Sequence, residues 1–398
     1  MVRRIIPPSI EDHIEQNAGG AEKARARKNR ILSERVRGMR IAGAKRAYEP
    51  GQGEKREVRD ADGTTNDDGP VVRLEDSPDT TDKFIDDPYD YAGVAYDYLF
   101  RIHGRHGPDG AAGRQLSIVH YSEGGGGWDN AAYYRDPQLG MVIVVGDGDV
   151  FPPFHLSPGI FAHEWGHALT EATCNLGYGN DEAGGNNEAG SDIFAALVEQ
   201  WRMGQTAGDA SWLIGEELFS AGLQGRALRD MLRRGPAYDD PLIGQDPQIN
   251  DASGYRRGQD PHVTSAVTNR WFAEACMQLP TRYSWETIGP VWFEAWTRLQ
   301  PTSGFTDVAA ATVTLARARY GENSAELAAV RYGWDAAKVA VPATLPDPVP
   351  TPPAPTEDSP CQFTDAEVSS LVRSLRRVVV AHPVGRRWLA TLRRLPSP

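Results

Sequence analysis

The sequence has little cysteine: only Cys174, Cys276 and Cys361 among 398 residues. They are too few and too far apart for a disulfide framework, and no CxxC metal site is possible. The chain also lacks any run of about 18 apolar residues, so no segment is expected to span a membrane. The basic N-terminus has no apolar segment and no small-residue cleavage site, so it is not an ordinary secretory signal peptide. The chain also has no excess of positive charge, since its formal net charge is −12. This charge disfavours nucleic acid and anionic membranes as partners.

Composition divides the chain into zones, and 40% apolar with 24% charged residues indicates a soluble globular protein. Residues 1–55 begin with Ile-Ile-Pro-Pro and continue as a basic, helix-prone stretch. The chain then turns acidic over 56–90, and this exposed junction is a plausible site for a proteolytic nick. A body extends to residue 342. It is followed by a Pro-rich linker, 343–362, and a basic helical tail, 363–398, that opens with a capping box.

Hydrophobic patterning predicts strands early in the body and helices later. Short runs rich in β-branched residues predict strands at 115–121 and 141–145. Ser157 followed by a proline is a good helix start, with the serine as N-cap, and predicts a helix over 158–174. Further helices are expected at 187–202, 262–277, 284–299, 306–320 and 323–337.

The segment 161–174, FAHEWGHALTEATC, contains two histidines four residues apart. On a helix His163 and His167 share one face, so their rings can bind one ion. Glu164 lies about 100° around the helix, where it can act on a metal-bound water without being a ligand. The HExxH pattern also arises by chance in soluble helices, and catalytic zinc requires three protein ligands plus water. A third ligand is therefore needed.

Glu188, in the run GGNNEAGSD, supplies a candidate third ligand. It follows His167 by 21 residues, enough for a helix to end and a second helix to present a carboxylate. Asp192 lies one helical turn later and can accept a hydrogen bond from a ligand histidine, which fixes its tautomer. An ordinary solvated acidic face is the alternative interpretation of Glu188 and Asp192. That alternative requires both the HExxH pattern and this pair of carboxylates to have arisen by chance.

These residues resemble the thermolysin-like zinc metalloproteases, the gluzincins of peptidase family M4. The likeness includes HEWGHALTE, NNEAGSDIFAALVE, WDNAAYY, WLIGEELF and DPHVTSAVTNRWF, and covers about residues 57–342. It implies a two-lobed α+β fold, with a strand-rich lobe over 56–175, a helical lobe over 176–342, and zinc in the cleft between them. The start, RRIIPPSIEDHIEQNAG, is similar to the short propeptide of the protealysin subgroup. The resemblance therefore implies a zymogen whose propeptide, residues 1–55, inhibits the enzyme intramolecularly until it is cut.

The resemblance also assigns roles at the site. Zinc would be held by His163, His167 and Glu188, with Asp192 behind them and Glu164 as general base. Tyr178 and His262 match donors to the oxyanion. Asn130 and Ala131 match positions that bind substrate backbone, and Arg229 matches the arginine that binds the carbonyl on the leaving side. Six apolar residues match positions at or near the family's specificity pocket, and the resemblance implies cleavage before Leu-, Phe- or Ile-type residues. Plain core packing is the alternative explanation for them. They are Phe151, Phe154, Ile160, Ile214, Leu218 and Leu228.

The chain departs from the family pattern in two places. Glu199 and Glu216 match calcium ligands, but Gly159, Ser211 and Leu213 replace others, so a full double calcium site is not expected. The family has an aspartate five residues before the histidine that matches His262, where this chain has Arg257; Asp260 or Asp251 could substitute. Thr264 replaces a usual asparagine.

The leading interpretation is a zinc-dependent neutral endopeptidase, expected to be a secreted monomer acting on proteins or peptides. Without an ordinary signal peptide, cytoplasmic storage or non-standard export are open. The alternative is a catalytically weak zinc-binding module that docks a partner through its basic tail. A structural zinc fold is disfavoured because four protein ligands would be expected.

Overall fold

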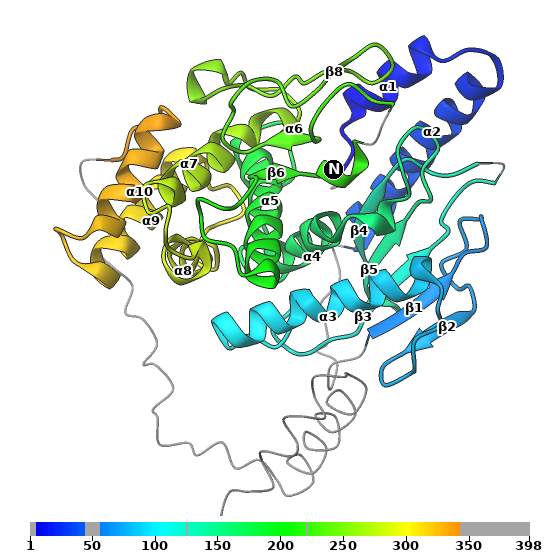
Figure 1. The fold of residues 1–398 in the computed structure, drawn as a ribbon, viewed down its shortest axis with the longest axis horizontal. Helices are drawn as coiled ribbons and strands as arrows, with labels where there is room; N and C mark the ends of the chain where they lie inside the picture. Colours follow the sequence, from blue (N-terminus) through cyan, green and yellow to red (C-terminus); the bar gives the residue numbers. More distant parts are fainter. Residues whose placement is uncertain (1–4, 44–55, 125, 220–221, 343–398) are drawn as a thin grey trace, which may run out of the picture. The chain divides into compact units, whose positions relative to one another are not determined.

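The computed structural model describes residues 5–43, 56–124, 126–219 and 222–342. All of them belong to the first of two units, Met1–Asp347 and Pro348–Pro398, and Figure 1 shows their arrangement. The predicted basic tail and Pro-rich linker lie outside the described residues, as does Cys361. In the described part, no helix combines the length and hydropathy that a membrane crossing needs.

The N-terminal lobe is built on a mixed sheet with the strand order β2-β1-β3-β5-β4. The strands β1, β3 and β5 run parallel, while β2 and β4 pair antiparallel at the two edges. The bounds of the strands are β1 (Arg56–Asp60), β2 (Val71–Leu74), β3 (Gln115–Val119), β4 (Ala131–Asp136) and β5 (Gly140–Val145). The strands predicted at 115–121 and 141–145 correspond to β3 and β5.

Side chains on β4 and β5 alternate between two buried faces, as the two-residue period of a strand requires. Tyr133 and Ile143 belong to the main core, whereas Ala132 and Val142 belong to a second apolar cluster. That second cluster also contains Leu32 from the N-terminal helices. The sheet is therefore covered on one face by the body and on the other by residues that precede β1.

Helices are the main regular elements of the rest of the described chain (Figure 1). The α-helices are α1 (Pro8–Asn17), α2 (Gly20–Gly43), α3 (Lys83–His103), α4 (Pro158–Ala172), α5 (Glu182–Met203), α6 (Pro261–Thr264), α7 (Ala266–Met277), α8 (Ile288–Trp296), α9 (Phe305–Tyr320) and α10 (Ala325–Ala336). Short 3-10 turns are η1 (Phe154–Leu156), η2 (Glu216–Leu218), η3 (Ala252–Gly254) and η4 (Ser284–Glu286), and two small hairpins pair β6 (Leu213–Ile214) with β7 (Arg229–Asp230) and β8 (Asp239–Asp240) with β9 (Gly244–Gln245). A strand-containing N-terminal lobe followed by a helical region is the predicted two-lobed α+β fold.

Some predicted helix boundaries were wrong. The helix expected at 187–202 begins earlier, at Glu182, because Asp181 caps it by accepting a hydrogen bond from the Gly184 amide. The helix expected at 262–277 is divided at Ser265 into α6 and α7. Ser157 is the N-cap residue of α4 as predicted, but its side chain does not cap the helix. Its hydroxyl instead donates to Glu217 at 2.7 Å.

Two glycines allow α5 to lie close to its neighbours, Gly166 at the contact of α4 with α5 and Gly190 at the contact of α5 with α8. A Cβ on Gly166 of α4 would lie 2.8 Å from the Ser191 Cα of α5, and one on Gly190 would lie 2.0 Å from the Trp296 ring. Real side chains do not tolerate such distances, so only glycine permits this approach. The close packing brings the carboxylates of α5 to the histidines of α4.

Candidate active site

Three buried side chains from α4 and α5 converge on one point. Donor atoms of His163, His167 and Glu188 all lie within 4.8 Å of one another, and all three side chains have 0% exposure. The distance from His163 Nε2 to Glu188 Oε2 is 3.4 Å, and that from His167 Nε2 to Glu188 Oε1 is 3.3 Å. This is the only such group of three or more His, Cys, Asp or Glu donors among the described residues.

The ring orientations are fixed from behind by α5. Asp192 Oδ1 lies 2.8 Å from His163 Nδ1, and Asn187 Oδ1 and Ser191 Oγ lie 3.1 and 2.7 Å from His167 Nδ1. Both Nε2 atoms therefore face Glu188. Although they are buried, His163 Nε2 and Glu188 Oε2 form no hydrogen bond with any described residue. Two imidazoles and a carboxylate with inward-facing lone pairs fit a zinc ion.

The electrostatics of the cluster favour positive charge. Burial opposes the imidazolium form, but the hydrogen-bonded carboxylate of Asp192 and the nearby carboxylate of Glu188 raise the pKa of His163 to about 9. Burial would raise the pKa of Glu188, yet the neighbouring His262 and His167 hold it well below its usual range. Protons and metal ions compete for sites of this kind, so the group is suited to a divalent cation.

Glu164 lies beside this group on α4 and is also fully buried. Its Oε2 accepts a hydrogen bond of 2.6 Å from the backbone amide of Tyr133 on β4. This contact connects the strand-rich lobe to the carboxylate next to the three donors. Glu164 is therefore held at the edge strand and not among the ligand atoms.

Two polar side chains from the helical lobe reach the same place. The Tyr178 hydroxyl donates to Glu188 Oε1, and His262 Nε2 lies 3.6 Å from Glu188 Oε2. The His262 Nδ1 atom contacts Asp260 Oδ1 at 2.6 Å. Asp260, rather than Asp251, is therefore the carboxylate partner of His262 in place of the aspartate that the family has where this chain has Arg257. Asp251 instead caps η3 and pairs with Lys338 at 2.9 Å. Burial works against the charged ring, but Glu188 and Asp260 raise the pKa of His262.

Arg229 on β7 is held by Asp192, with distances of 2.8 Å from Nε to Oδ2 and 2.7 Å from Nη2 to Oδ1. Burial would raise the pKa of Asp192, but the Arg229 guanidinium and His163 lower it. The remaining Nη1 of Arg229 donates to the carbonyl oxygen of Ile5 at 3.2 Å. The arginine thus joins the zinc-facing helix to the N-terminal segment of the chain.

Asn130 and Ala131, at the start of β4, contact the same segment. The Ile6 amide donates to Asn130 Oδ1 at 3.1 Å, and the Ile5 amide donates to the Ala131 carbonyl at 3.3 Å. Residues 5 and 6 therefore add to the free edge of β4, which is the edge strand of the sheet. Every predicted backbone-binding residue is in contact with the N-terminal segment.

The predicted pocket positions are all apolar and buried, with exposures between 0% and 3%, and they belong to the same core cluster as Ile5 and Ile6. These residues are Phe151, Phe154, Ile160, Ile214, Leu218 and Leu228.

Unlike the three clustered donors, the residues at the predicted calcium positions do not form a group of metal-binding atoms within the described residues. Glu199 is largely buried, and this burial with the nearby Glu217 raises its pKa to about 8. A Cβ at Gly159 would lie 2.9 Å from its Oε2. No second cluster of three donors occurs in the described ranges.

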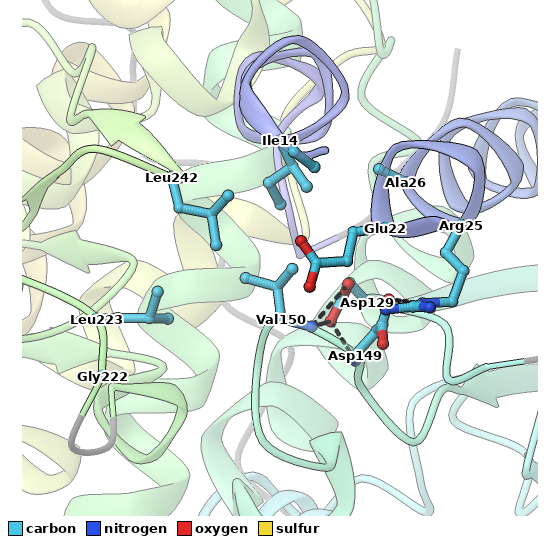
Figure 2. A pocket seen from close by; sticks show the side chains of 11 residues that line it. Ile14, Glu22, Arg25, Ala26, Asp129, Asp149, Val150, Gly222, Leu223 and Leu242 are labelled. Atoms are coloured by element: carbon cyan, nitrogen blue, oxygen red, sulfur yellow. Dashed lines mark hydrogen bonds and ion pairs between the residues drawn. The ribbon is translucent and has the colours of Figure 1, made fainter. Parts of the chain in front are cut away.

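A cavity of about 380 Å³ lies between the N-terminal helices and the body. Figure 2 shows Glu22 extending into it near Asp129, while the ion pair between Arg25 and Asp149, 2.8 Å, closes one side. None of the three clustered donors lines this cavity. It belongs to the junction of α1 and α2 with the catalytic lobes.

The sequence interpretation missed three supporting residues. Asn187 and Ser191 both contact the His167 ring, and Asn269 of α7 donates to Asp192 Oδ2 at 2.7 Å. Asn187 and Ser191 flank Glu188 at a four-residue spacing, so their shared helical face could have been noticed. Asn269 is 77 residues from Asp192, and no local pattern points to it.

A buried two-histidine, one-carboxylate donor set, with a glutamate beside it between a strand-rich and a helical lobe, defines a metallohydrolase of the HExxH type. Models of the thermolysin metallopeptidase catalytic domain and of its alpha-helical domain match residues 36–171 and 174–339. The extracellular metalloprotease of Pectobacterium carotovorum subsp. carotovorum is 33% identical over 292 residues, which are 72% of this chain and 81% of that protein. The precursor of protealysin from Serratia proteamaculans has a similar structure, with a TM-score of 0.73 and 30% identity, over 85% of this chain and 100% of that one.

The chain belongs to the thermolysin family of metallopeptidases, peptidase family M4, and is a metalloendopeptidase of the protealysin type. Other relatives are matched over less of their length. Protease PrtS of a Photorhabdus strain is 35% identical over 64% of its length, and thermolysin of Alicyclobacillus acidocaldarius is 35% identical over 45% of its length. These two relatives align with 60% and 64% of this chain.

Proposed function

We propose that this protein is a zinc-dependent endopeptidase made as a zymogen. The observation that carries the proposal is the convergence of His163, His167 and Glu188 within 4.8 Å, beside a glutamate held by the edge strand. When bound by these three residues, zinc would act as a Lewis acid and lower the pKa of a water molecule.

Glu164 is the proton carrier. Its Oε2 is fixed by the Tyr133 amide at 2.6 Å, so the carboxylate stays oriented while it takes a proton from water and delivers it to the leaving nitrogen. A positioned general base contributes about 10²–10⁴-fold to the rate.

Tyr178 and His262 are the proposed donors to the oxyanion. Tyr178 contacts Glu188 Oε1 and His262 Nε2 lies 3.6 Å from Glu188 Oε2, so a carbonyl oxygen placed at the cluster would lie near both. Asp260 holds the His262 ring through Nδ1, which leaves Nε2 directed at the cluster. Preorganised donors of this kind stabilise developing negative charge.

Substrates are proposed to bind as an added strand along β4, with their backbone on Asn130, Ala131 and Arg229. The apolar pocket residues favour a bulky hydrophobic side chain after the cleaved bond. The contacts of Ile5 and Ile6 support this mode, since a segment of the chain itself already binds there.

Residues 1–55 are proposed to be the propeptide. Glu11 of α1 is 4% exposed, and its Oε1 accepts hydrogen bonds from Ser33 Oγ and from Asn130 Nδ2, the latter at 3.2 Å. Trp128 Nε1 donates to the same serine at 3.0 Å. These bonds tie both N-terminal helices to the substrate strand. The cavity in Figure 2 leaves the interface less tightly packed than a core, which favours later release.

The catalytic lobes are proposed to extend over 56–175 and 176–342. One relative is named an extracellular metalloprotease, and we propose that this enzyme also acts outside the cell. Glu199 and its neighbours are proposed to bind calcium weakly at most, because so few carboxylates remain there.

Hydrolysis of denatured casein by the purified chain, with zinc content measured in the same sample, tests the function. We expect one zinc per chain and products that begin with Leu, Phe or Ile, and we expect Glu164→Ala to retain zinc but lose activity about 10²-fold or more. Glu171→Gln, on the same helix but paired with Arg135, is the matched control and should remain active. A wild type that binds zinc stoichiometrically yet cleaves nothing even after residues 1–55 have been removed would favour a zinc-binding module instead.

A further inference from the structure

We propose that Asp129 and Asp149 form an acidic subsite, which selects substrates that carry arginine or lysine at the second or third residue after the cleaved bond. The inference rests on the proposed function and adds a charge preference to it, beyond the hydrophobic residue directly after that bond. In the uncleaved chain, Arg25 of α2 already pairs with Asp149 at this place.

The N-terminal segment shows the direction in which an extended chain runs along β4. The Ile5 amide donates to the Ala131 carbonyl at 3.3 Å, and the Ile6 amide donates to Asn130 Oδ1 at 3.1 Å. One step toward the C-terminus of the segment is therefore one step back along β4. The next residue of β4 and its preceding turn in that direction is Asp129.

A substrate that follows this path reaches the acidic residues. In the proposed binding mode, the hydrophobic residue after the cleaved bond takes the place of Ile5, whose carbonyl accepts from Arg229 at 3.2 Å. The second residue takes the place of Ile6, and the third lies about 3.3 Å further on, beside Asp129. The N-terminal segment itself turns away here, because Pro7 is the N-cap residue of α1. Successive side chains of a strand point to opposite faces, so one of the two following residues faces the carboxylates.

Asp129 is a buried carboxylate in the wall of the cavity described above. It is 4% exposed, and its Oδ1 accepts from the amides of Asp149, Val150 and Phe151 at 2.7, 2.9 and 3.0 Å. Asn29 of α2 donates to its Oδ2 at 3.3 Å. Burial raises the pKa of Asp129 to about 6 in spite of these amides, and the charge of Asp149 adds to the increase. A cation beside Asp129 would therefore stabilise its ionised form.

The contact of Arg25 with Asp149 shows that a guanidinium fits at this wall. Arg25 Nε lies 2.8 Å from Asp149 Oδ2, and Figure 2 shows this pair next to Asp129. The hydrogen bond and the charge of Asp149 raise the pKa of Arg25, with smaller contributions from Glu22 and Asp129. The chain thus binds one of its own cations where a substrate cation is proposed to bind.

The remaining surface of the cavity suits a long basic side chain. The cavity measures about 380 Å³, and Val150, Leu223 and Leu242 contribute apolar surface on the body side. Arginine and lysine place their aliphatic stems on apolar surface while the charged end reaches polar groups. Glu22 also extends into the cavity (Figure 2), but it belongs to α2 and leaves with Arg25 when the propeptide is released. The two carboxylates of the body then remain without that basic partner.

Matched peptides test the preference. The full chain is folded with zinc, and limited proteolysis then removes residues 1–55. Quenched peptides share one sequence with leucine after the cleaved bond and carry Arg, Gln or Glu at the second or third residue after that bond. At one of these two positions, we expect kcat/KM for the Arg peptide to exceed that for the Glu peptide at least about tenfold, because attraction and like-charge repulsion both contribute. Raising NaCl from about 0.05 to about 0.5 M should reduce this ratio severalfold and change the Gln peptide little.

A substitution at Asp149 tests the residue assignment. Asp149→Asn should lower the Arg-to-Glu ratio to about threefold or less. The ratio compares two substrates in one preparation, so it does not depend on how much of the variant folds. Asp147→Asn is the matched control, since Asp147 is two residues away, pairs with His120 at 2.9 Å and does not line the cavity. Its ratio should equal that of the wild type.

Two results overturn this inference alone. The first is equal kcat/KM for the Arg and Glu peptides in the wild type, which leaves Asp149 only as an anchor for α2. The second is a ratio that stays unchanged in Asp149→Asn. In both cases hydrolysis of the Gln peptide shows that the enzyme is active, whereas zinc-loaded protein that cleaves none of the peptides after loss of residues 1–55 contradicts the proposed function itself.

Discussion

Replacing Asp192 by asparagine should lower both the zinc affinity and the free energy of unfolding, and a control substitution can tell the two effects apart. Asp192 is fully buried and receives Arg229 through two nitrogens, His163 at 2.8 Å and Asn269 at 2.7 Å. The Asp192→Asn variant leaves the Arg229 guanidinium buried without its counter-charge, which typically costs about 3–5 kcal/mol. It also replaces one carboxylate oxygen with an NH2 donor, so the side chain can no longer accept from His163, Arg229 and Asn269 together. A weakened partner of this kind usually reduces metal affinity about 10–100-fold.

The assay uses the Glu164→Ala background, so that autolysis does not interfere. Zinc affinity is measured by competition with a fluorescent chelator at pH 7.5, and stability by urea unfolding of the zinc-free chain. Asp230→Asn is the matched control, since Asp230 is equally buried and pairs with Arg226 and Arg234 but contacts no histidine. It should lose stability and keep its zinc affinity. If Asp192→Asn binds zinc within twofold of the parent, the orienting role is refuted.

Three further predictions concern other parts of the molecule. Glu11→Ala removes the acceptor for Ser33 and Asn130, so loss of residues 1–55 followed on gels should accelerate about tenfold. An unchanged half-life of the full-length chain would argue against a role of these hydrogen bonds in holding the propeptide. Burial opposes ionisation of Glu75, but hydrogen bonds from Arg56 lower its pKa to about 2. Its stabilisation is therefore complete above the unfolded pKa near 4.5 and is lost as pH falls toward 2. Urea unfolding should show that the advantage of wild type over Glu75→Gln, about 1–2 kcal/mol after allowance for solvent screening, shrinks from pH 6 to pH 3; a constant difference would count against the ion pair. Gly190→Ala places a methyl 2.0 Å from the Trp296 ring and should cost about 3 kcal/mol in thermal unfolding, whereas Gly19→Ala, with open space around it, should be neutral.

The fold class and the family were predictable because local signals agreed with one another. Strand runs at 115–121 and 141–145 and an apolar helix around HExxH fall on β3, β5 and α4. The two-histidine face follows from helical spacing, and the carboxylate at Glu188 was a candidate because 21 residues separate it from His167 and because the family pattern includes it. The structure brings these residues together, because α4 and α5 approach closely at Gly166.

The rest depended on contacts between distant segments. Asn269 reaches Asp192 across 77 residues, and nothing local marks it. The partner of His262 could be narrowed to Asp260 or Asp251 but not chosen, since the choice depends on the path of a loop. The start of α5 was placed too late because Asp181, rather than a residue near 187, supplies the cap. Caps and loops are decided by single hydrogen bonds, which periodicity does not record.

The sheet described above has one face and one edge covered by residues that precede β1. Leu32 and Val36 of α2 pack on its second face, and Ile5 pairs with its free edge. A nascent polypeptide lacking these residues would expose the free edge of β4 and the apolar second face of the sheet while the helical lobe is still being synthesised. Such surfaces recruit other copies and lead to aggregation. We therefore expect that production of the enzyme in soluble form requires the N-terminal segment, either in cis or as a separately supplied peptide.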